Sequence, residues 1–299
     1  MTFEGVITPI LTPFTKEGAV SEDRFKDFIE FLRKNGIRNL FVCGTFGSGP
    51  MMTVEERKRV IELSIEFSGR NTKIIVNVSS TSPEVSRELA KYARQIGADA
   101  VASTPPFYYS YDVEAVHRFY AMLLSSVDLP VFIYNIPSRV GFNLPPGMLS
   151  KLADEGIAGI KESSGDLVRF YRYMSAVEKR DFVFLIGTEA LLVPAVLAGA
   201  DGCVSGLSNI FPELVTELYS LAKSGNFKEA FKKQFLAIEL REILFTGDPI
   251  PTSYALLRLR GIDVGYPKPP FKMPSKMELE ELKRRLAAKN VLNSYSGRS

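Results

Sequence analysis

Eight short apolar runs recur along the chain, and this repeat limits the possible folds more than any other feature. The runs are rich in β-branched residues and start at intervals of roughly 20–35 residues. They cover residues 6–10, 39–44, 73–78, 98–104, 130–135, 157–161, 182–187 and 201–206. Continuous apolar strands of this kind are typical of a parallel sheet whose two faces are both covered by other elements.

Helical patterns with clear start and stop signals lie between these runs. Residues 22–35 carry apolar side chains at helical spacing, and Gly36 follows as a stop. Thr53 and Glu56 form the signature of a capping box, which predicts a second helix that extends to Phe67. Further helices are expected to begin at Ser82-Pro83, Asp112 and Asp166.

Strands and helices that alternate in this way predict an α/β protein, a (β/α)₈ TIM barrel over residues 1–224. An open, doubly wound sheet is the competing architecture. From residue 225 to 299 the pattern is helical, with three helices expected at 226–246, 251–260 and 277–289 and a rigid connector at 266–270. We expect this part to be a C-terminal three-helix extension of the barrel.

Composition narrows the chemistry that such a barrel can perform. The chain has one histidine, His117, and two cysteines, so a histidine-rich metal site is excluded. The 37 basic and 34 acidic residues are mixed along the chain, which argues against nucleic-acid binding. There is no signal peptide and no apolar run of the ~18 residues that a membrane span needs. We expect a cytoplasmic enzyme whose chemistry comes from Lys, Tyr, Ser, Thr and carboxylates.

Active sites of TIM barrels lie at the carboxyl ends of the strands, where Lys161 ends the sixth run. Burial disfavours the ammonium form of a lysine, and a neutral amine can attack a carbonyl to form an imine. The alternative is an ion pair of Lys161 with Glu162 or with Glu189, which follows the seventh run.

Two further candidates lie at the end of the fifth run and just after it. The phenol of Tyr134 could transfer protons, although a tyrosine here is often a core residue. Arg139 could bind a carboxylate through two parallel hydrogen bonds, or form a surface ion pair.

Two loops complete the set of candidates. Residues 44–50 read GTFGSGP, and such a loop lets backbone N–H groups converge on an anion such as a substrate carboxylate. The aromatic run at 107–109 is expected to cover a pocket or a subunit interface.

With these motifs in this order, the chain resembles the dihydrodipicolinate synthase/N-acetylneuraminate lyase family of class I aldolases. The resemblance rests on residues 5–14, 44–50, 105–109, 134–141, 159–166 and 200–209. It implies that Lys161 forms a Schiff base with pyruvate and that Tyr134 shuttles protons. Thr45 and Tyr108 would assist, with Tyr108 reaching across from a neighbouring subunit.

The resemblance also implies a substrate site and an assembly. Gly44, Phe46 and Gly47 would hold the pyruvate carboxylate, Val204 would place its carbonyl near the imine, and Glu189 would contribute to substrate binding. Members of the family are typically tetramers, built as dimers of dimers, and need no metal or organic cofactor.

Branch markers within the family conflict. Phe46 stands where the family usually has a second threonine and Ser48 where it has an acid, a form similar to 2-keto-3-deoxygluconate aldolases. Arg139 instead resembles the synthase branch. We therefore expect a lyase that cleaves a 2-keto-3-deoxy sugar acid to pyruvate and an aldehyde. The alternatives are a synthase that condenses pyruvate with aspartate semialdehyde and a non-catalytic binding protein.

Overall fold

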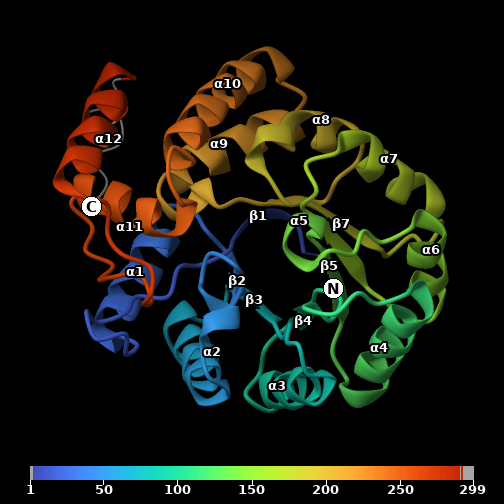
Figure 1. Cartoon of the computed structure of the whole chain (residues 1–299). Coiled ribbons are helices and arrows are strands. Elements are labelled where there is room, and N and C mark those ends of the chain that lie inside the picture. Colours follow the sequence, from blue (N-terminus) through green and yellow to red (C-terminus); the bar gives the residue numbers. More distant parts are fainter. Residues whose placement is uncertain (1–2, 290, 292–299) are drawn as a thin grey trace.

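The computed structural model describes residues 3–289 and 291, in which eight parallel strands close into a barrel in sequence order (Figure 1). The predicted TIM barrel is confirmed, and the open sheet is excluded because β1 pairs with β8. The strands are β1 (Gly5–Thr8), β2 (Asn39–Val42), β3 (Lys73–Asn77), β4 (Ala100–Ser103), β5 (Val131–Asn135), β6 (Gly159–Glu162), β7 (Val183–Ile186) and β8 (Gly202–Val204).

Helices follow the strands and form a ring around the barrel (Figure 1). The expected caps are present, since the side chains of Thr53, Asp112 and Asp166 accept hydrogen bonds from backbone N–H groups of the helices that they begin. The α-helices of the ring are α1 (Glu22–Lys34), α2 (Val54–Ser68), α3 (Pro83–Gln95), α4 (Val113–Ser126), α6 (Pro146–Asp154), α7 (Leu167–Ala176), α8 (Leu192–Leu197) and α9 (Pro212–Lys223). The short helix α5 (Pro137–Val140) lies inside this ring, above the barrel (Figure 1). Short 3₁₀ turns are η1 (Gly49–Met51), η2 (Glu189–Leu191) and η3 (Leu207–Asn209).

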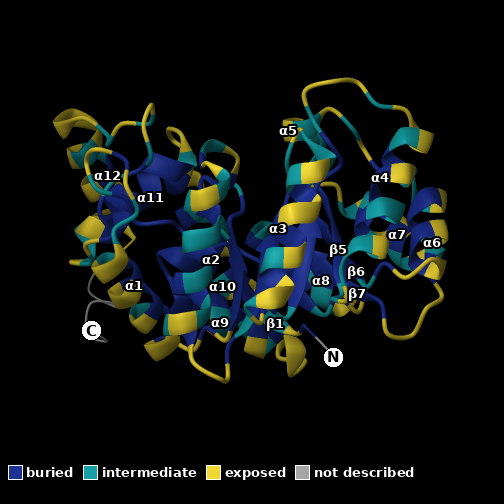
Figure 2. Ribbon diagram, turned by 90° about the horizontal axis from the view of Figure 1, so that it is seen from below, coloured by how far each residue is buried: buried dark blue, intermediate teal, exposed yellow. Residues whose placement is uncertain are grey.

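Two apolar clusters divide the barrel into an inside and an outside. Alternate strand residues such as Phe132 and Tyr134 pack with Phe41 in the barrel interior. Their neighbours Ile133 and Ile160 point outward into the larger cluster beneath the helices. Figure 2 shows the buried strands between helices whose outer faces are exposed. This alternation places Lys161 on the inner face and Glu162 on the outer face of β6.

The C-terminal extension that the sequence predicts is present as α10 (Phe227–Leu244), α11 (Pro249–Leu259) and α12 (Lys276–Ala288). It is tied to the barrel by the buried hydroxyl of Tyr254, which donates to the carbonyl of Thr12 at 2.7 Å. The domain boundary between residues 224 and 225 stays a prediction, and residues 290 and 292–299 of the predicted extension lie outside the described residues. Within the part of the chain that is described, no helix has the length and apolar character needed to cross a bilayer.

Candidate active site

Lys161 lies inside the barrel, close to the carboxyl end of β6, and its side chain is almost wholly buried. Its Nζ atom is 4.1 Å from the ring centre of Phe41 and 3.7 Å from that of Tyr134. Burial in this aromatic setting lowers the pKa of the amine, and the nearby Tyr134 phenol opposes the effect only in part. A larger share of the amine is therefore neutral and nucleophilic than in an exposed lysine.

The ion-pair alternative for Lys161 is not what the structure shows. Among the described residues, neither Glu162 nor Glu189 lies within 4 Å of its amine as a salt-bridge partner. The Glu162 carboxylate accepts a hydrogen bond from Asn135 outside the barrel, and the Glu189 carboxylate accepts one from Ser205. The amine therefore faces the cavity without a carboxylate to hold it as an ammonium.

Tyr134 and Thr45 form the hydroxyl pair that a proton relay needs. Tyr134 lies beside Lys161 in the register of β5 and β6, and its hydroxyl is 3.3 Å from Thr45 Oγ1. The Tyr134 ring packs edge-on against Phe41, with ring centres 5.5 Å apart. Because this packing fixes the ring, the phenol is presented to the space above Lys161 and can donate or accept a proton there.

The glycine-rich loop after β2 folds into a tight turn. Cys43 and Ser48 adopt left-handed backbone conformations, and a Cβ atom at Gly49 would overlap the carbonyl oxygen of Cys43. In the described structure the backbone N–H groups of Thr45, Phe46 and Gly47 have no acceptor, whereas those of Ser48 and Gly49 bond within the loop. Free donors beside a cavity are suited to an anion.

Phe46 places an aromatic ring in the same cavity. The ring lies over Gly206 after β8, where any side chain would overlap it. The ring makes this part of the lining apolar, so any anion held here depends on the backbone donors.

Lys161 forms part of the floor of a cavity of about 480 Å³ that opens at the carboxyl ends of the strands. Its lining includes Thr45, Tyr134, Arg139 and Val204, and Val204 is the β8 residue whose carbonyl was expected near the imine. The lining also includes Ser163 and Thr188, which the sequence did not single out.

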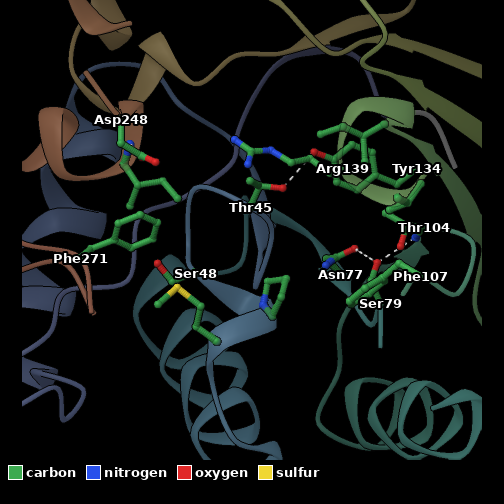
Figure 3. A pocket seen from close by; sticks show the side chains of 15 residues that line it. Thr45, Ser48, Asn77, Ser79, Thr104, Phe107, Tyr134, Arg139, Asp248 and Phe271 are labelled. Carbon is green, nitrogen blue, oxygen red and sulfur yellow. Dashed lines mark hydrogen bonds between the residues drawn. The ribbon is translucent and has the colours of Figure 1, made fainter. Parts of the chain in front are cut away.

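A second chamber of about 230 Å³ adjoins the first and shares Thr45, Tyr134 and Arg139 with it. In Figure 3, Asp248 and Phe271 from the C-terminal part lie on one side of this chamber, opposite Arg139 and Tyr134. Phe107 lines it as well. The extension therefore helps to close the mouth of the barrel.

Glu189 and Tyr108 do not line either cavity. Glu189 Oε2 accepts from Ser205 Oγ at 2.7 Å, and Glu189 Oε1 is 3.4 Å from Nε of Arg241, which does line the larger cavity. Tyr108 is 85% exposed and has a positive φ. A part for Tyr108 in catalysis, through a second chain, stays a prediction.

Some residues of the site carry no local sequence signal. Phe41 looks like any apolar residue of a buried strand, and Arg241 looks like any basic residue of an exposed helix face. Only the closed barrel places Phe41 below the amine, and only the packing of α10 on η2 places Arg241 at the cavity.

A desolvated lysine beside a tyrosine–threonine hydroxyl pair, in the mouth of a TIM barrel, defines a class I aldolase, which works through a lysine imine. The family model described as the dihydrodipicolinate synthetase family matches residues 2–289. The chain belongs to this family. It is an enzyme, a class I lyase or aldolase acting on 2-oxo acids, and not the non-catalytic protein that the sequence left open.

Similar proteins come from both bacteria and archaea. The 4-hydroxy-tetrahydrodipicolinate synthase of Methanopyrus kandleri is 32% identical over 97% of this chain and 97% of its own. The synthase of Acetivibrio thermocellus is 32% identical over 95% of this chain and 96% of its own. The solved 2-keto-3-deoxygluconate aldolase variant of Sulfolobus solfataricus has a TM-score of 0.88 at 27% identity, with 96% of each chain covered.

Proposed function

We propose that the protein condenses pyruvate, held as an imine on Lys161, with aspartate semialdehyde, as a 4-hydroxy-tetrahydrodipicolinate synthase does. The observation that carries the proposal is Arg139, whose guanidinium lines the mouth of the cavity. Among the described residues its side chain has neither a hydrogen-bond nor an ion-pair partner. A cation left free at a cavity mouth suits a substrate that brings a second carboxylate. The names of the most similar relatives support the synthase over the sugar-acid aldolase.

The chemistry begins when the neutral Lys161 amine adds to C2 of pyruvate. A C–N bond forms, and the carbonyl oxygen leaves as water after protonation by the Tyr134–Thr45 pair. The same pair then accepts a proton from the pyruvate methyl group, which gives the nucleophile that attacks the aldehyde. The free N–H groups of Thr45, Phe46 and Gly47 would hold the pyruvate carboxylate.

The remaining residues have supporting roles in this proposal. Gly44 permits the loop geometry, the Val204 carbonyl faces the imine, and Glu189 acts through Ser205 at the cavity wall. The exposed Tyr108 completes the relay of a neighbouring chain, within a homotetramer built as a dimer of dimers. A cytoplasmic location and independence of metal ions stay predictions from the sequence.

A second candidate is the cleavage of a 2-keto-3-deoxy sugar acid. Thr188 lines the larger cavity, and its hydroxyl, which accepts from the backbone N–H of Ala190 at 3.3 Å, could donate to a hydroxyl group of a sugar chain. The solved aldolase from Sulfolobus solfataricus is similar over nearly the whole chain.

Parallel assays with aspartate semialdehyde and D-glyceraldehyde as acceptors separate the two candidates. The proposal predicts a preference for the semialdehyde, and a rise in its KM of about 10- to 100-fold in Arg139→Ala, because a charge-assisted hydrogen bond contributes about 1.5–3 kcal/mol. The KM for pyruvate serves as the internal control and should stay within about threefold. A preference for glyceraldehyde, unaffected by Arg139→Ala, would instead establish the sugar-acid aldolase.

A further inference from the structure

A buried carboxylate follows the reactive lysine in the chain and points to the other side of the sheet. Glu162 is the last residue of β6, has no exposed surface and lies on the outer face, where Ile160 joins the apolar cluster beneath the helices. Its partner in β5 is Asn135, which is also fully buried and is the last residue of that strand.

Glu162 and Asn135 are joined by a short side-chain hydrogen bond. Asn135 Nδ2 donates to Glu162 Oε2 at 2.7 Å, and the backbone N–H of Ser164 donates to Glu162 Oε1 at 2.6 Å. Asn135 Oδ1 in turn accepts from the backbone N–H of Leu144 at 3.2 Å. Asn135 Nδ2 also donates to Asn143 Oδ1 at 3.1 Å. In this small network the carboxylate accepts from both neighbours, and the Asn135 amide both donates and accepts.

Burial makes the ionised form of the Glu162 carboxylate energetically unfavourable. Desolvation raises the pKa of Glu162, and its bonds to Ser164 and Asn135 oppose the effect. Among the described residues no cation forms a salt bridge with it. A pair of apolar side chains would fill the same space without a desolvation penalty, so stability alone does not account for the pair.

Glu162 and Asn135 lie on the outer face of the barrel, directly after Lys161 and Tyr134 on the inner face. In the register of β5 and β6, Tyr134 is opposite Lys161 and Asn135 is opposite Glu162. These are the final pairs of the ladder, and beyond them a backbone hydrogen bond from the Ser163 N–H to the Asn135 carbonyl, at 2.8 Å, also joins the two strand ends. The side-chain bond between Asn135 and Glu162 adds a second link on the outer face, at the level where the Tyr134 ring and Lys161 Nζ are 3.7 Å apart inside the barrel.

We propose that Glu162 and Asn135 are positioning residues, which lock the ends of β5 and β6 from outside the barrel and so align Tyr134 with Lys161 inside it. The inference rests on the proposed roles of Lys161 and Tyr134. A displacement of about 1 Å between reacting groups can lower a rate about 10²-fold. Loss of the pair should therefore slow proton transfer more than it weakens pyruvate binding.

The test follows exchange of the pyruvate methyl hydrogens in D₂O, which needs the imine and the proton relay but no aldehyde. Glu162→Ala and Asn135→Ala should lower kcat for exchange about 10- to 100-fold, with the KM for pyruvate within about threefold. Glu162→Gln should also be impaired, because the new amide NH₂ group would face an N–H donor, either that of Asn135 or that of Ser164. Tyr120→Phe is the matched control, since it removes a buried hydrogen bond to Ser103 behind β4 and should leave exchange unchanged.

The double variant Asn135→Asp/Glu162→Gln reverses the polarity of the bond, because the new amide at 162 donates to the new carboxylate at 135. That carboxylate still accepts from the N–H of Leu144, and the Asn143 amide can turn to donate to it. It should recover exchange to within about threefold of the wild type. Recovery also keeps the test decisive if Glu162→Ala does not fold. Folded single variants that exchange at the wild-type rate, or a folded double variant that does not recover, would overturn the inference. Failure of the wild type to form a borohydride-trapped pyruvate adduct would instead refute the proposed function.

Discussion

The proposed chemistry depends on the amine of Lys161. The burial of this amine predicts how the rate changes with pH. Imine formation requires the neutral amine, and burial lowers the pKa of Lys161 from its ordinary value of 10.5. The rate of imine formation should therefore rise with pH while the amine is protonated, and reach its plateau below pH 10.5. Rapid-quench trapping of the pyruvate adduct across pH measures this. A rate that still rises tenfold per pH unit near pH 10 would contradict the burial argument.

Tyr134 makes a second prediction at this scale. Tyr134→Phe keeps the ring that packs on Phe41 but removes the hydroxyl 3.3 Å from Thr45. If the phenol transfers protons, kcat should fall roughly 10²–10³-fold. Steady-state rates and an unfolding curve of the same variant separate lost chemistry from lost stability. A loss of kcat below about fivefold would rule out the relay.

Single residues also show the limit of prediction from sequence. Lys161, Tyr134 and Thr45 could be proposed because strand ends meet at one end of a barrel. Phe41 could not, because its role depends on which face of β2 points inward and on the closure of the barrel. The orientation of Glu189 was also beyond the sequence, since Ser205 and Arg241 come from separate elements.

The loop between β2 and α2 carries the ring of Phe46, which lies against Gly206. Gly206 has an ordinary backbone conformation, and the Phe46 ring is the group that a Cβ atom there would overlap. Gly206→Ala should push this ring into the cavity and raise the KM for pyruvate about tenfold or more. In a Phe46→Thr background the same substitution should have little effect.

A double-mutant cycle measures that dependence directly. The KM values of the two single variants and of the double variant should give a coupling of about 1–3 kcal/mol. Additive effects at the two positions would mean that the ring does not shape the site.

The helices and strands could be predicted from the sequence better than the contacts between them. The caps Thr53, Asp112 and Asp166 and the apolar strands are local signals, and each appears in the structure close to its expected bounds. The left-handed conformation of Cys43 was not predictable, because a cysteine has no preference for it. It goes with the tight turn in which Gly49 packs against the Cys43 carbonyl, and the sequence does not reveal this contact.

The whole molecule depends on the contacts between the barrel and its C-terminal helices. Glu213 of α9 and Arg260, which follows α11, form a buried ion pair at 2.6 Å. Glu213→Ala should lower the free energy of unfolding by about 3 kcal/mol, because it leaves a buried guanidinium without its carboxylate. Arg118→Ala, which breaks an exposed pair on α4, is the control and should cost under about 1 kcal/mol.

Denaturant unfolding of both variants compares the two losses. Equal losses would show that the buried pair does not hold the extension. The sequence predicted the extension as helices but not this pair, because residues 213 and 260 meet only once α11 has packed against the barrel.

The central claim is that Lys161 carries pyruvate as an imine. Borohydride reduction in the presence of pyruvate, followed by peptide mapping by mass spectrometry, tests it most directly. The account predicts one reduced pyruvate adduct per chain, on the peptide that contains Lys161, and no adduct in a folded Lys161→Ala variant. An adduct on another lysine, or none in the active wild-type enzyme, would contradict it.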